Sequence, residues 1–189
     1  MNANIKLKKF GFRTIIPHAG AFYNVLQNNR ARLEPWFWWA GQNTTPNLLK
    51  TIAFMTLYVL DTKRKKLIYK LSKSKKYDEQ FLIFKESKLA GMTGLDNIDN
   101  DKKNAELWYF LTAENEGQGT MSASLKLIED YAFKTKDMNM LYAKTAAGNE
   151  RSESLLKRND YNIGRVEYDV PTSPRNPKIT DLMTWVKHR

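Results

Sequence analysis

The sequence predicts a mixed α/β fold of the α+β kind, in which helices cover a central sheet. Three observations predict it. Apolar segments with strand and helix spacing alternate through the second half of the chain. Two segments of the first half have the apolar stripe of a helix. The 189 residues, 42% of them hydrophobic, are enough for one domain with a sizeable core over residues 1–189.

The first half is expected to contain edge strands and two helices. β-branched residues mixed with Lys and Arg predict one or two edge strands over 5–17, ended by Pro17. A helix is predicted over 18–28, and a second one after Pro46 that continues into the basic segment. One helical stripe supports the second helix: Leu48, Ile52, Met55 and Val59.

The second half is expected to supply most of the sheet. Strands are predicted over 80–86, 92–98, 105–112, 138–147, 161–170 and 180–188. Ala90 and Gly91 are interpreted as the break between the first two of these strands. Within the segment 105–112, the run from Leu107 to Leu111 is apolar and aromatic, which is typical of a buried central strand. Helices are predicted after Gly119 and over 149–158, where Asn149 is the N-cap.

Composition excludes several classes of site. The chain has no cysteine, which excludes disulfides, thiolate zinc sites and cysteine nucleophiles. Its two histidines, His18 and His188, lie at opposite ends, so no metal is expected. The longest uncharged apolar stretch, 51–60, is too short to span a membrane, and no secretory signal is visible. We therefore expect a cytoplasmic protein with no membrane partner.

The net charge of +11 is concentrated in the segment 63–76, which has no acidic residue. Its basic residues are Lys63, Arg64, Lys65, Lys66, Lys70, Lys73, Lys75 and Lys76. One interpretation is contact with an anionic partner such as nucleic acid, the ribosome or an acidic protein. The other is a solvated helix face, which is favoured because no RNA-binding motif and no series of aromatic residues accompanies the segment.

A glycine-rich turn follows the predicted central strand and begins a helix. The segment reads ENEGQG at 114–119 and is followed by Thr120. Two glycines at such a turn leave backbone N–H groups facing outward at the positive end of the helix dipole, which favours phosphate or pyrophosphate binding. The segment matches neither the P-loop nor the three-glycine dinucleotide fingerprint, so a plain turn is the other interpretation.

Several segments, in order, resemble the GNAT superfamily of acetyl-CoA-dependent N-acetyltransferases, and within it the RimJ/RimL-like branch that includes ribosomal-protein acetyltransferases. The resembling segments are RARL at 30–33 with Trp36 and Trp39, AELWYFL at 105–111, ENEGQG at 114–119, DYAF at 130–133, and NERS at 149–152 with Leu155, Leu156, Lys157 and Tyr161. The superfamily's acyl-CoA signature has Gln or Arg where this chain has Glu114, while both glycines match.

The resemblance implies a GNAT-like fold: a twisted, mostly antiparallel sheet of about six or seven strands, flanked by about four helices and splayed where acyl-CoA binds. It implies acetyl-CoA as cosubstrate. The segment 63–76 departs from the family pattern: it is longer than expected between the second helix and the next strand, and is interpreted as insertion-like. The pantetheine arm is expected at the backbone of Phe110, Leu111 and Thr112. The pyrophosphate is expected at Gly117, Gln118, Gly119 and Thr120. Asn149 is expected at the pantetheine or the acceptor, and homodimers are common in the branch.

Acetylation of an amine requires that the amine loses a proton, that the oxyanion is stabilised and that the leaving thiolate is protonated. By its place on the central strand, Glu106 is the candidate base. Its carboxylate could instead belong to a salt bridge. In that case an amine that is already neutral, or a relay through water, would replace the base. By analogy with the branch, Ser152 is the candidate acid; it could equally be a surface serine. Leu156 stands where many superfamily members have a tyrosine donor.

The acceptor is expected in an aromatic site. Trp36, Trp39 and Trp108 are the expected acceptor-binding residues, with core packing as the other interpretation. The predicted function is acetyl transfer from acetyl-CoA to a primary amine through a ternary complex. The amine belongs to a protein N-terminus, such as that of a ribosomal protein, or to a small molecule. The alternatives are a non-enzymatic basic module that binds nucleic acid or an acidic protein, and a degenerate acyltransferase that binds CoA.

Overall fold

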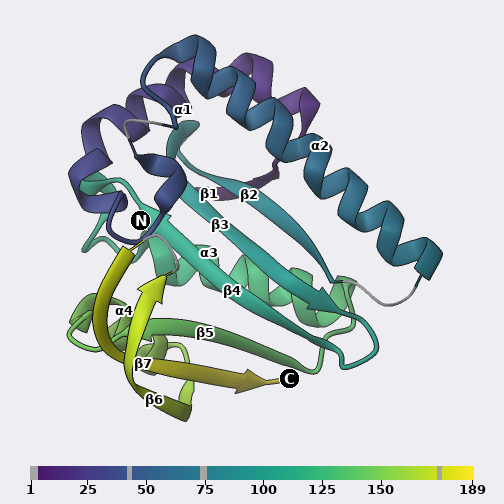
Figure 1. Ribbon diagram of the computed structural model, residues 1–189, viewed down its shortest axis with the longest axis vertical. Helices are drawn as coiled ribbons and strands as arrows, with labels where there is room; N and C mark the ends of the chain where they lie inside the picture. The colour runs from purple at the N-terminus through teal and green to yellow at the C-terminus, as the bar shows by residue number, and fades with distance from the viewer. Residues whose placement is uncertain (1–3, 42–43, 73–75, 174–175) are drawn as a thin grey trace.

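A seven-stranded sheet forms the centre of the computed structural model, which describes residues 4–41, 44–72, 76–173 and 176–189 (Figure 1). The strands are β1 (Ile5–Lys9), β2 (Tyr77–Lys85), β3 (Lys88–Asp99), β4 (Asn104–Leu111), β5 (Met140–Ala146), β6 (Asn162–Ser173) and β7 (Asn176–His188). Across the sheet their order is β1-β2-β3-β4-β5-β7-β6, and only the β4–β5 pair is parallel. The mixed, mostly antiparallel sheet expected from the sequence is confirmed.

Helices cover both faces of the sheet. They are α1 (Phe12–Leu33), α2 (Leu48–Ser72), α3 (Thr120–Asp130) and α4 (Glu150–Arg158). Figure 1 shows α1 and α2 along one face and α3 behind the sheet. Apolar side chains of α1 and α2, among them Phe22 and Met55, pack on Leu82 and Phe110, whereas those of α3 and α4 pack into a second core that contains Leu107. No helix in the described residues is both long and apolar enough to cross a membrane.

The strands β4 and β5 diverge along most of their length. They pair at three positions, of which the last joins Glu106 to Tyr142. Beyond it β4 keeps its pairing with β3 up to Leu111, and β5 keeps its pairing with β7 up to Ala146. The two strands therefore open a wedge in the middle of the sheet, as Figure 1 shows. This is the splay that the sequence resemblance implies, and the facing backbone groups of the two strands need another partner.

The prediction of strands over 5–17 is right for β1 and wrong for residues 12–17, which begin α1. Thr14 caps this helix, because its Oγ1 accepts a hydrogen bond from the backbone N–H of Gly11 at 2.8 Å. Pro17 lies inside the helix rather than at a strand end. Proline removes one backbone donor there, but Ile15 and Ala19 on either side are buried, and their burial outweighs the lost hydrogen bond.

The turn between β2 and β3 also differs from the prediction. It lies at Glu86 and Ser87, whereas Ala90 and Gly91 lie inside β3. Both turn residues have positive φ, 47° and 70°, as the favoured two-residue hairpin requires. Glycine and asparagine usually supply these angles, so the sequence carries no turn signal at this point.

The basic segment 63–76 begins as the last part of α2, so the predicted continuation of the second helix into this segment is confirmed. Lys63 lies over the ring of Phe12, with 4.4 Å between its Nζ and the ring centroid. Two further cations hold the helix against β2: Lys65 with Asp78 at 2.7 Å and Lys66 with Glu79 at 2.8 Å. These contacts favour the interpretation as a helix face. The side chains of residues 69–75 lie outside what the structure describes.

Candidate active site

The glycine turn forms the N-terminal end of α3. Gly117 and Gly119 both have φ of +71°, a left-handed conformation that glycine adopts without strain. A Cβ atom on either residue would meet nothing within 4 Å, so the space over the turn is open. The Oγ1 of Thr120 is buried and has no hydrogen-bond partner among the described residues. Together with the free N–H groups of the first helical turn, this arrangement suits a phosphate oxyanion.

Side chains from other elements hold the turn in place. The Oδ1 of Asn29, a buried residue of α1, accepts a hydrogen bond from the Ala113 N–H at 2.9 Å. Within the turn, Nε2 of Gln118 donates to the carbonyl of Glu114 at 2.7 Å. The Nζ of Lys85 in turn contacts the Gln118 side chain. The turn is therefore fixed from two sides and is preorganised for a ligand.

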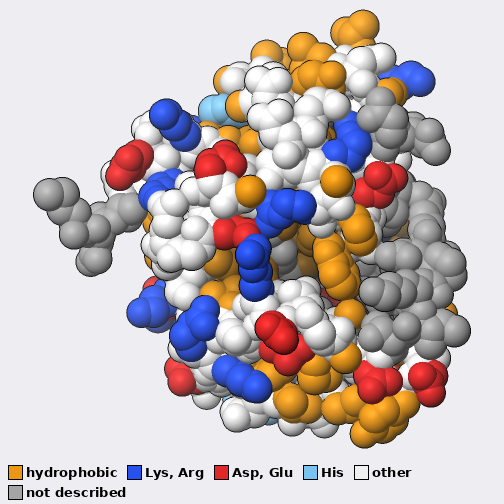
Figure 2. Space-filling view, turned by 90° about the vertical axis from the view of Figure 1, so that its left-hand side faces the viewer, with side chains coloured by type: hydrophobic (Ala, Val, Ile, Leu, Met, Phe, Trp, Pro, Cys, Tyr) orange, Lys and Arg blue, Asp and Glu red, His pale blue; other side chains and the backbone are white. Residues whose placement is uncertain are grey.

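Two arginines pair with Glu116, one of the two acidic residues of the turn. Glu116 forms ion pairs with Arg32 of α1, which precedes the turn in the sequence, and with Arg151 of α4, which follows it. Figure 2 views the molecule from the left of Figure 1. It shows Lys and Arg side chains beside acidic ones near the middle of this face, with hydrophobic side chains next to them. The charge of Glu116 is thus offset by two cations beside the turn.

The inner edge of β4 presents backbone groups to the splay. The N–H of Thr112 donates to the carbonyl of Ala90, so Thr112 and, by alternation along the strand, Phe110 face β3. The backbone groups of Leu111 and Tyr109 therefore face the splay. Of the three residues expected at the pantetheine, the backbone of Leu111 faces the splay, as does that of Tyr109, whereas the backbones of Phe110 and Thr112 face β3.

A serine and a tyrosine meet on the α3/α4 side of the splay. Asn149 caps α4 by accepting a hydrogen bond from the Ser152 N–H at 3.3 Å, as the sequence predicts for an N-cap. The Oγ of Ser152 lies 3.2 Å from the hydroxyl of Tyr109. Burial raises the pKa of Tyr109 to about 12, so this phenol keeps its proton at neutral pH. Leu156 is fully buried and takes no part in this pair.

Two carboxylates lie on the other face of the sheet, below α1 and α2. Glu106 stands at the last β4–β5 pair, at the root of the splay, and opposite Asp96 of β3. It accepts a hydrogen bond from Nδ2 of Asn97 at 3.1 Å, and Lys144 Nζ lies 3.7 Å from it. The salt-bridge interpretation of Glu106 therefore describes its surroundings in part. Among the described residues, no group of three or more His, Asp and Glu could hold a metal ion.

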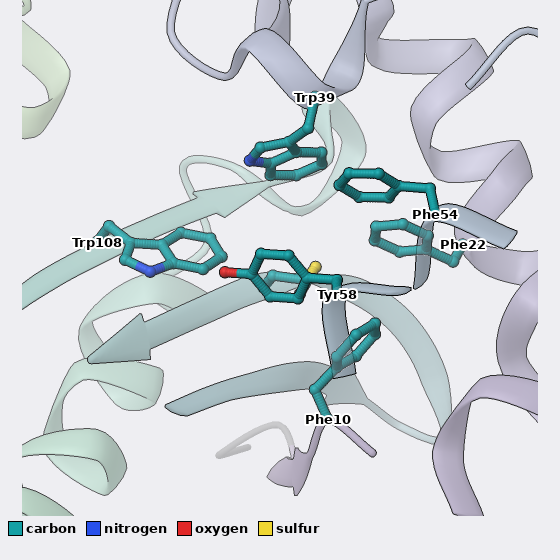
Figure 3. Close-up of a pocket in the computed structure, with 7 residues that line it drawn as sticks. Phe10, Phe22, Trp39, Phe54, Tyr58 and Trp108 are labelled. Carbon is teal, nitrogen blue, oxygen red and sulfur yellow. The ribbon is translucent and has the colours of Figure 1, made fainter. Parts of the chain in front are cut away.

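The tryptophans divide between a pocket and the surface. Trp39 and Trp108 pack edge to face, with ring centroids 6.4 Å apart, and both line a pocket between the helices and the sheet (Figure 3). Other aromatic residues complete the pocket: Phe10, Phe22, Phe54 and Tyr58. Trp36 is 47% exposed and does not line it. The side chain of Trp38 lies outside what the structure describes.

Comparison with known proteins places this arrangement in a family. The family model of the acetyltransferase (GNAT) domain matches residues 10–162. The chain belongs to this family. The match contains the glycine turn, the central strand and the Asn149 cap, which are the segments on which the sequence resemblance depends.

Individual relatives in the GNAT family match only part of the chain. The putative ribosomal N-acetyltransferase YdaF of Bacillus subtilis (strain 168) is 33% identical over 73 residues, which are 39% of this chain and 40% of that protein. The ribosomal-protein-serine acetyltransferase of Escherichia coli (strain K12) is 28% identical over 85 residues, 45% of this chain and 48% of that protein. The matches thus span less than half the length of these curated relatives.

A solved GNAT structure matches the whole fold. RimL, a ribosomal L7/L12 alpha-N-protein acetyltransferase in complex with coenzyme A, has a TM-score of 0.77 to this chain at 20% identity. The match covers 100% of this chain and 95% of that one. At this identity the likeness confirms the GNAT fold, including the sheet and its flanking helices.

Two residues of this candidate site were not singled out from the sequence. Tyr109 lies three positions after Glu106 on the same strand, so strand alternation alone could have placed it on the opposite face. Asp96 has no such local signal, because its partners Gln80 and Trp108 are brought to it by the pairing of three strands.

Proposed function

We propose that this chain is an acetyl-CoA-dependent N-acetyltransferase that transfers an acetyl group to a primary amine through a ternary complex. One observation carries the proposal: the splay of β4 and β5 ends beside a preorganised, open glycine turn. An extended ligand with an anionic end and an amide-containing arm would satisfy both features. Acetyl-CoA has this form, because its pyrophosphate and its pantetheine arm carry the two kinds of group.

The residues at the turn fit such a ligand. Gly117, Gln118 and Gly119 would hold the pyrophosphate through backbone N–H groups, and the unpartnered hydroxyl of Thr120 would donate to it. The backbone of Leu111 and Tyr109 would pair with the pantetheine arm in the splay. Asn149 would keep the start of α4 in position beside that arm.

The two faces of the sheet would supply opposite proton transfers. Ser152, with Tyr109 behind it, would give a proton to the leaving thiolate. On the α1/α2 face, Glu106 and Asp96 lie opposite each other, and this carboxylate pair would take a proton from the amine. Glu106 is the member of the pair that the sequence suggests. Trp39 and Trp108 would line the acceptor site on this face.

Two classes of acceptor amine fit the proposed reaction. The names of the two curated relatives refer to ribosomal proteins, which favours a protein N-terminus and, with it, a cytoplasmic enzyme. A small amine such as a polyamine is the other class, since the pocket is aromatic. A homodimer is a further part of the proposal, and a sizing experiment tests it.

Acetyl transfer is the experiment that tests the proposal. The chain is incubated with acetyl-CoA and either a peptide amide with a free N-terminal serine or spermidine, and products are identified by mass spectrometry. We expect one acetyl group on the amine of one class and stoichiometric release of free thiol. Binding of RNA with steep salt dependence, together with indifference to acetyl-CoA, would instead support the non-enzymatic basic module.

Replacing Ser152 with alanine is expected to lower kcat by about 100-fold, which is the usual contribution of a positioned proton donor. Replacing Tyr109 with phenylalanine should cost about 10-fold, because Ser152 keeps its own hydroxyl. The double variant should be no slower than Ser152→Ala, since the two groups act in one chain. Ser154→Ala, an exposed serine on the same helix, is the matched control and should leave kcat unchanged. Full kcat in Ser152→Ala would contradict the assignment.

A further inference from the structure

A half-buried carboxylate lies at the edge of the aromatic pocket. The Oδ1 of Asp96 accepts a hydrogen bond from Nε1 of Trp108 at 2.9 Å and another from Nε2 of Gln80 at 3.0 Å. Trp108 and Tyr58 both line the pocket, and Figure 3 shows the hydroxyl of Tyr58 pointing toward the Trp108 ring. Asp96 is therefore held by neutral donors, next to two aromatic rings of the kind that attract an ammonium group.

Asp96 and Glu106 differ in the charged groups beside them: Glu106 has a lysine nearby, whereas the neighbours of Asp96 are acidic or neutral. The ionisable groups that face it or adjoin it are Tyr58 of α2, Asp78 of β2, Glu106 of β4 and Tyr142 of β5. The nearby lysines have other partners, since Lys65 pairs with Asp78 and Lys144 lies beside Glu106. Among the described residues, no cation forms an ion pair with Asp96. Burial, and then the charge of Asp78, raise the pKa of Asp96 to about 7.

We propose that Asp96 accepts the first proton from the acceptor's ammonium group, and that the acceptor is an amine that is protonated at neutral pH. This inference rests on the proposed function and specifies its proton acceptor. Glu106, with Lys144 beside it, is the charged partner that helps to bind the ammonium and keeps the proton affinity of Asp96 high. Hydrogen bonds from Gln80 and from Trp108, which lines the pocket, hold the carboxylate of Asp96 beside the Trp108 ring.

The protons balance in this scheme. The ammonium group gives one proton to the Asp96 carboxylate and attacks the thioester as a neutral amine. The new C–N bond forms as the C–S bond breaks, and the second proton of the nitrogen reaches the thiolate through Ser152. Asp96 then releases its proton to solvent. One ammonium ion and one acetyl-CoA thus give one amide, one thiol and one proton.

The test compares two conservative variants, Asp96→Asn and Glu106→Gln, in the full chain. The measurement is kcat as a function of pH, from about 5.5 to 8.5, at saturating acetyl-CoA and saturating peptide amide with a free N-terminal serine. In the unmodified chain we expect kcat to fall on the acid side with a midpoint near 7. Asp96→Asn should lower kcat at neutral pH about 100-fold and remove this acid limb, with an unchanged KM for acetyl-CoA.

Glu106→Gln should keep the acid limb and move it to lower pH, because the loss of a nearby negative charge lowers the pKa of Asp96. The reverse pattern, in which Glu106→Gln removes the limb and Asp96→Asn only moves it, would overturn the proposal and assign the proton to Glu106. An unmodified chain that acetylates neither the peptide nor spermidine would overturn the proposed function and this role with it. An active chain whose Asp96→Asn variant is equally active would overturn this role alone.

A second readout does not depend on activity. The indole N–H of Trp108 donates to Asp96, so its NMR resonance should move with pH around the midpoint of the acid limb. In Asp96→Asn that movement should disappear while the resonance itself remains, which also shows that the variant is folded. A Trp108 resonance that does not move between about pH 5.5 and 8.5 in the unmodified chain would overturn the proposal.

Discussion

Replacement of Gly91 by alanine is expected to lower the free energy of unfolding by about 3 kcal/mol, the upper part of the range for an overpacked core. A Cβ atom on Gly91 would lie 2.2 Å from the carbonyl oxygen of Phe110 and 2.9 Å from the Cα of Leu111. Both are backbone atoms of β4, so the clash is relieved only if the strand moves. Because β4 forms one edge of the splay, acetyl-CoA binding should weaken together with stability.

A matched substitution in a helix is expected to raise the free energy of unfolding rather than lower it. Gly20 lies in α1, where an added Cβ atom would meet nothing within 4 Å. Gly20→Ala should raise stability by about 0.5–1 kcal/mol, because alanine is the better helix former. Thermal unfolding of both variants checks the pair, with Gly91→Ala expected to lower Tm by about 6–12 °C. A Tm for Gly91→Ala equal to that of the original chain would show that β3 and β4 are not packed as described.

Replacement of Glu79 by glutamine is expected to cost about 3 kcal/mol, the lower end of the range for a broken buried ion pair. The carboxylate of Glu79 is 2% exposed and pairs with Lys9 at 2.9 Å, Lys66 at 2.8 Å and Lys136 at 3.3 Å. Lys9 and Lys66 can turn to solvent in the variant, but Lys136 is only 15% exposed and would keep an unmatched charge. The carboxylate, on β2, therefore joins α2 and the segment after α3 to the sheet and also pairs with Lys9 of the neighbouring strand β1.

The stability that Glu79 contributes to the fold is expected to decrease as the pH falls. Burial by itself would raise the pKa of Glu79, but hydrogen bonds from Lys66, Tyr131 and Lys9 lower it from 4.5 to about 2. A folded-state pKa below the unfolded one gives stability that is fully present above pH 4.5 and is lost as the pH falls toward 2. The difference in unfolding free energy between the original chain and Glu79→Gln should shrink over this window. The exposed Glu34→Gln is the control, and a difference for Glu79→Gln that stays constant on acidification would contradict the assignment.

The parts of the fold that could be predicted are those that a local pattern specifies. The apolar stripes of α2 and α3 have the helical period, and the apolar run from Leu107 to Leu111 is typical of a central strand. Asn149 caps α4 as predicted, because the cap is a contact with Ser152 three residues away. The glycine turn is likewise local.

The parts that could not be predicted depend on neighbours distant in the sequence. Pro17 is tolerated inside α1 because the adjacent side chains are buried against the sheet. Gly91 is needed because β4 passes close to it, not because a turn occurs there. In the site, the environment of Asp96 is created by Gln80 and Trp108, and that of Glu116 by Arg32 and Arg151. No spacing in the sequence brings these groups together.

Thermal unfolding with and without acetyl-CoA tests the central claim most directly. At a concentration near 100 times Kd, acetyl-CoA should stabilise the folded state by about 2.7 kcal/mol. For a chain of this size, Tm should rise by about 5–10 °C. ATP, which is an anion without a pantetheine arm, should give a much smaller rise, and this separates the splay from general attraction to a basic protein. If neither acetyl-CoA nor CoA raises Tm, the chain does not bind acyl-CoA at the splay, and the proposed function is wrong.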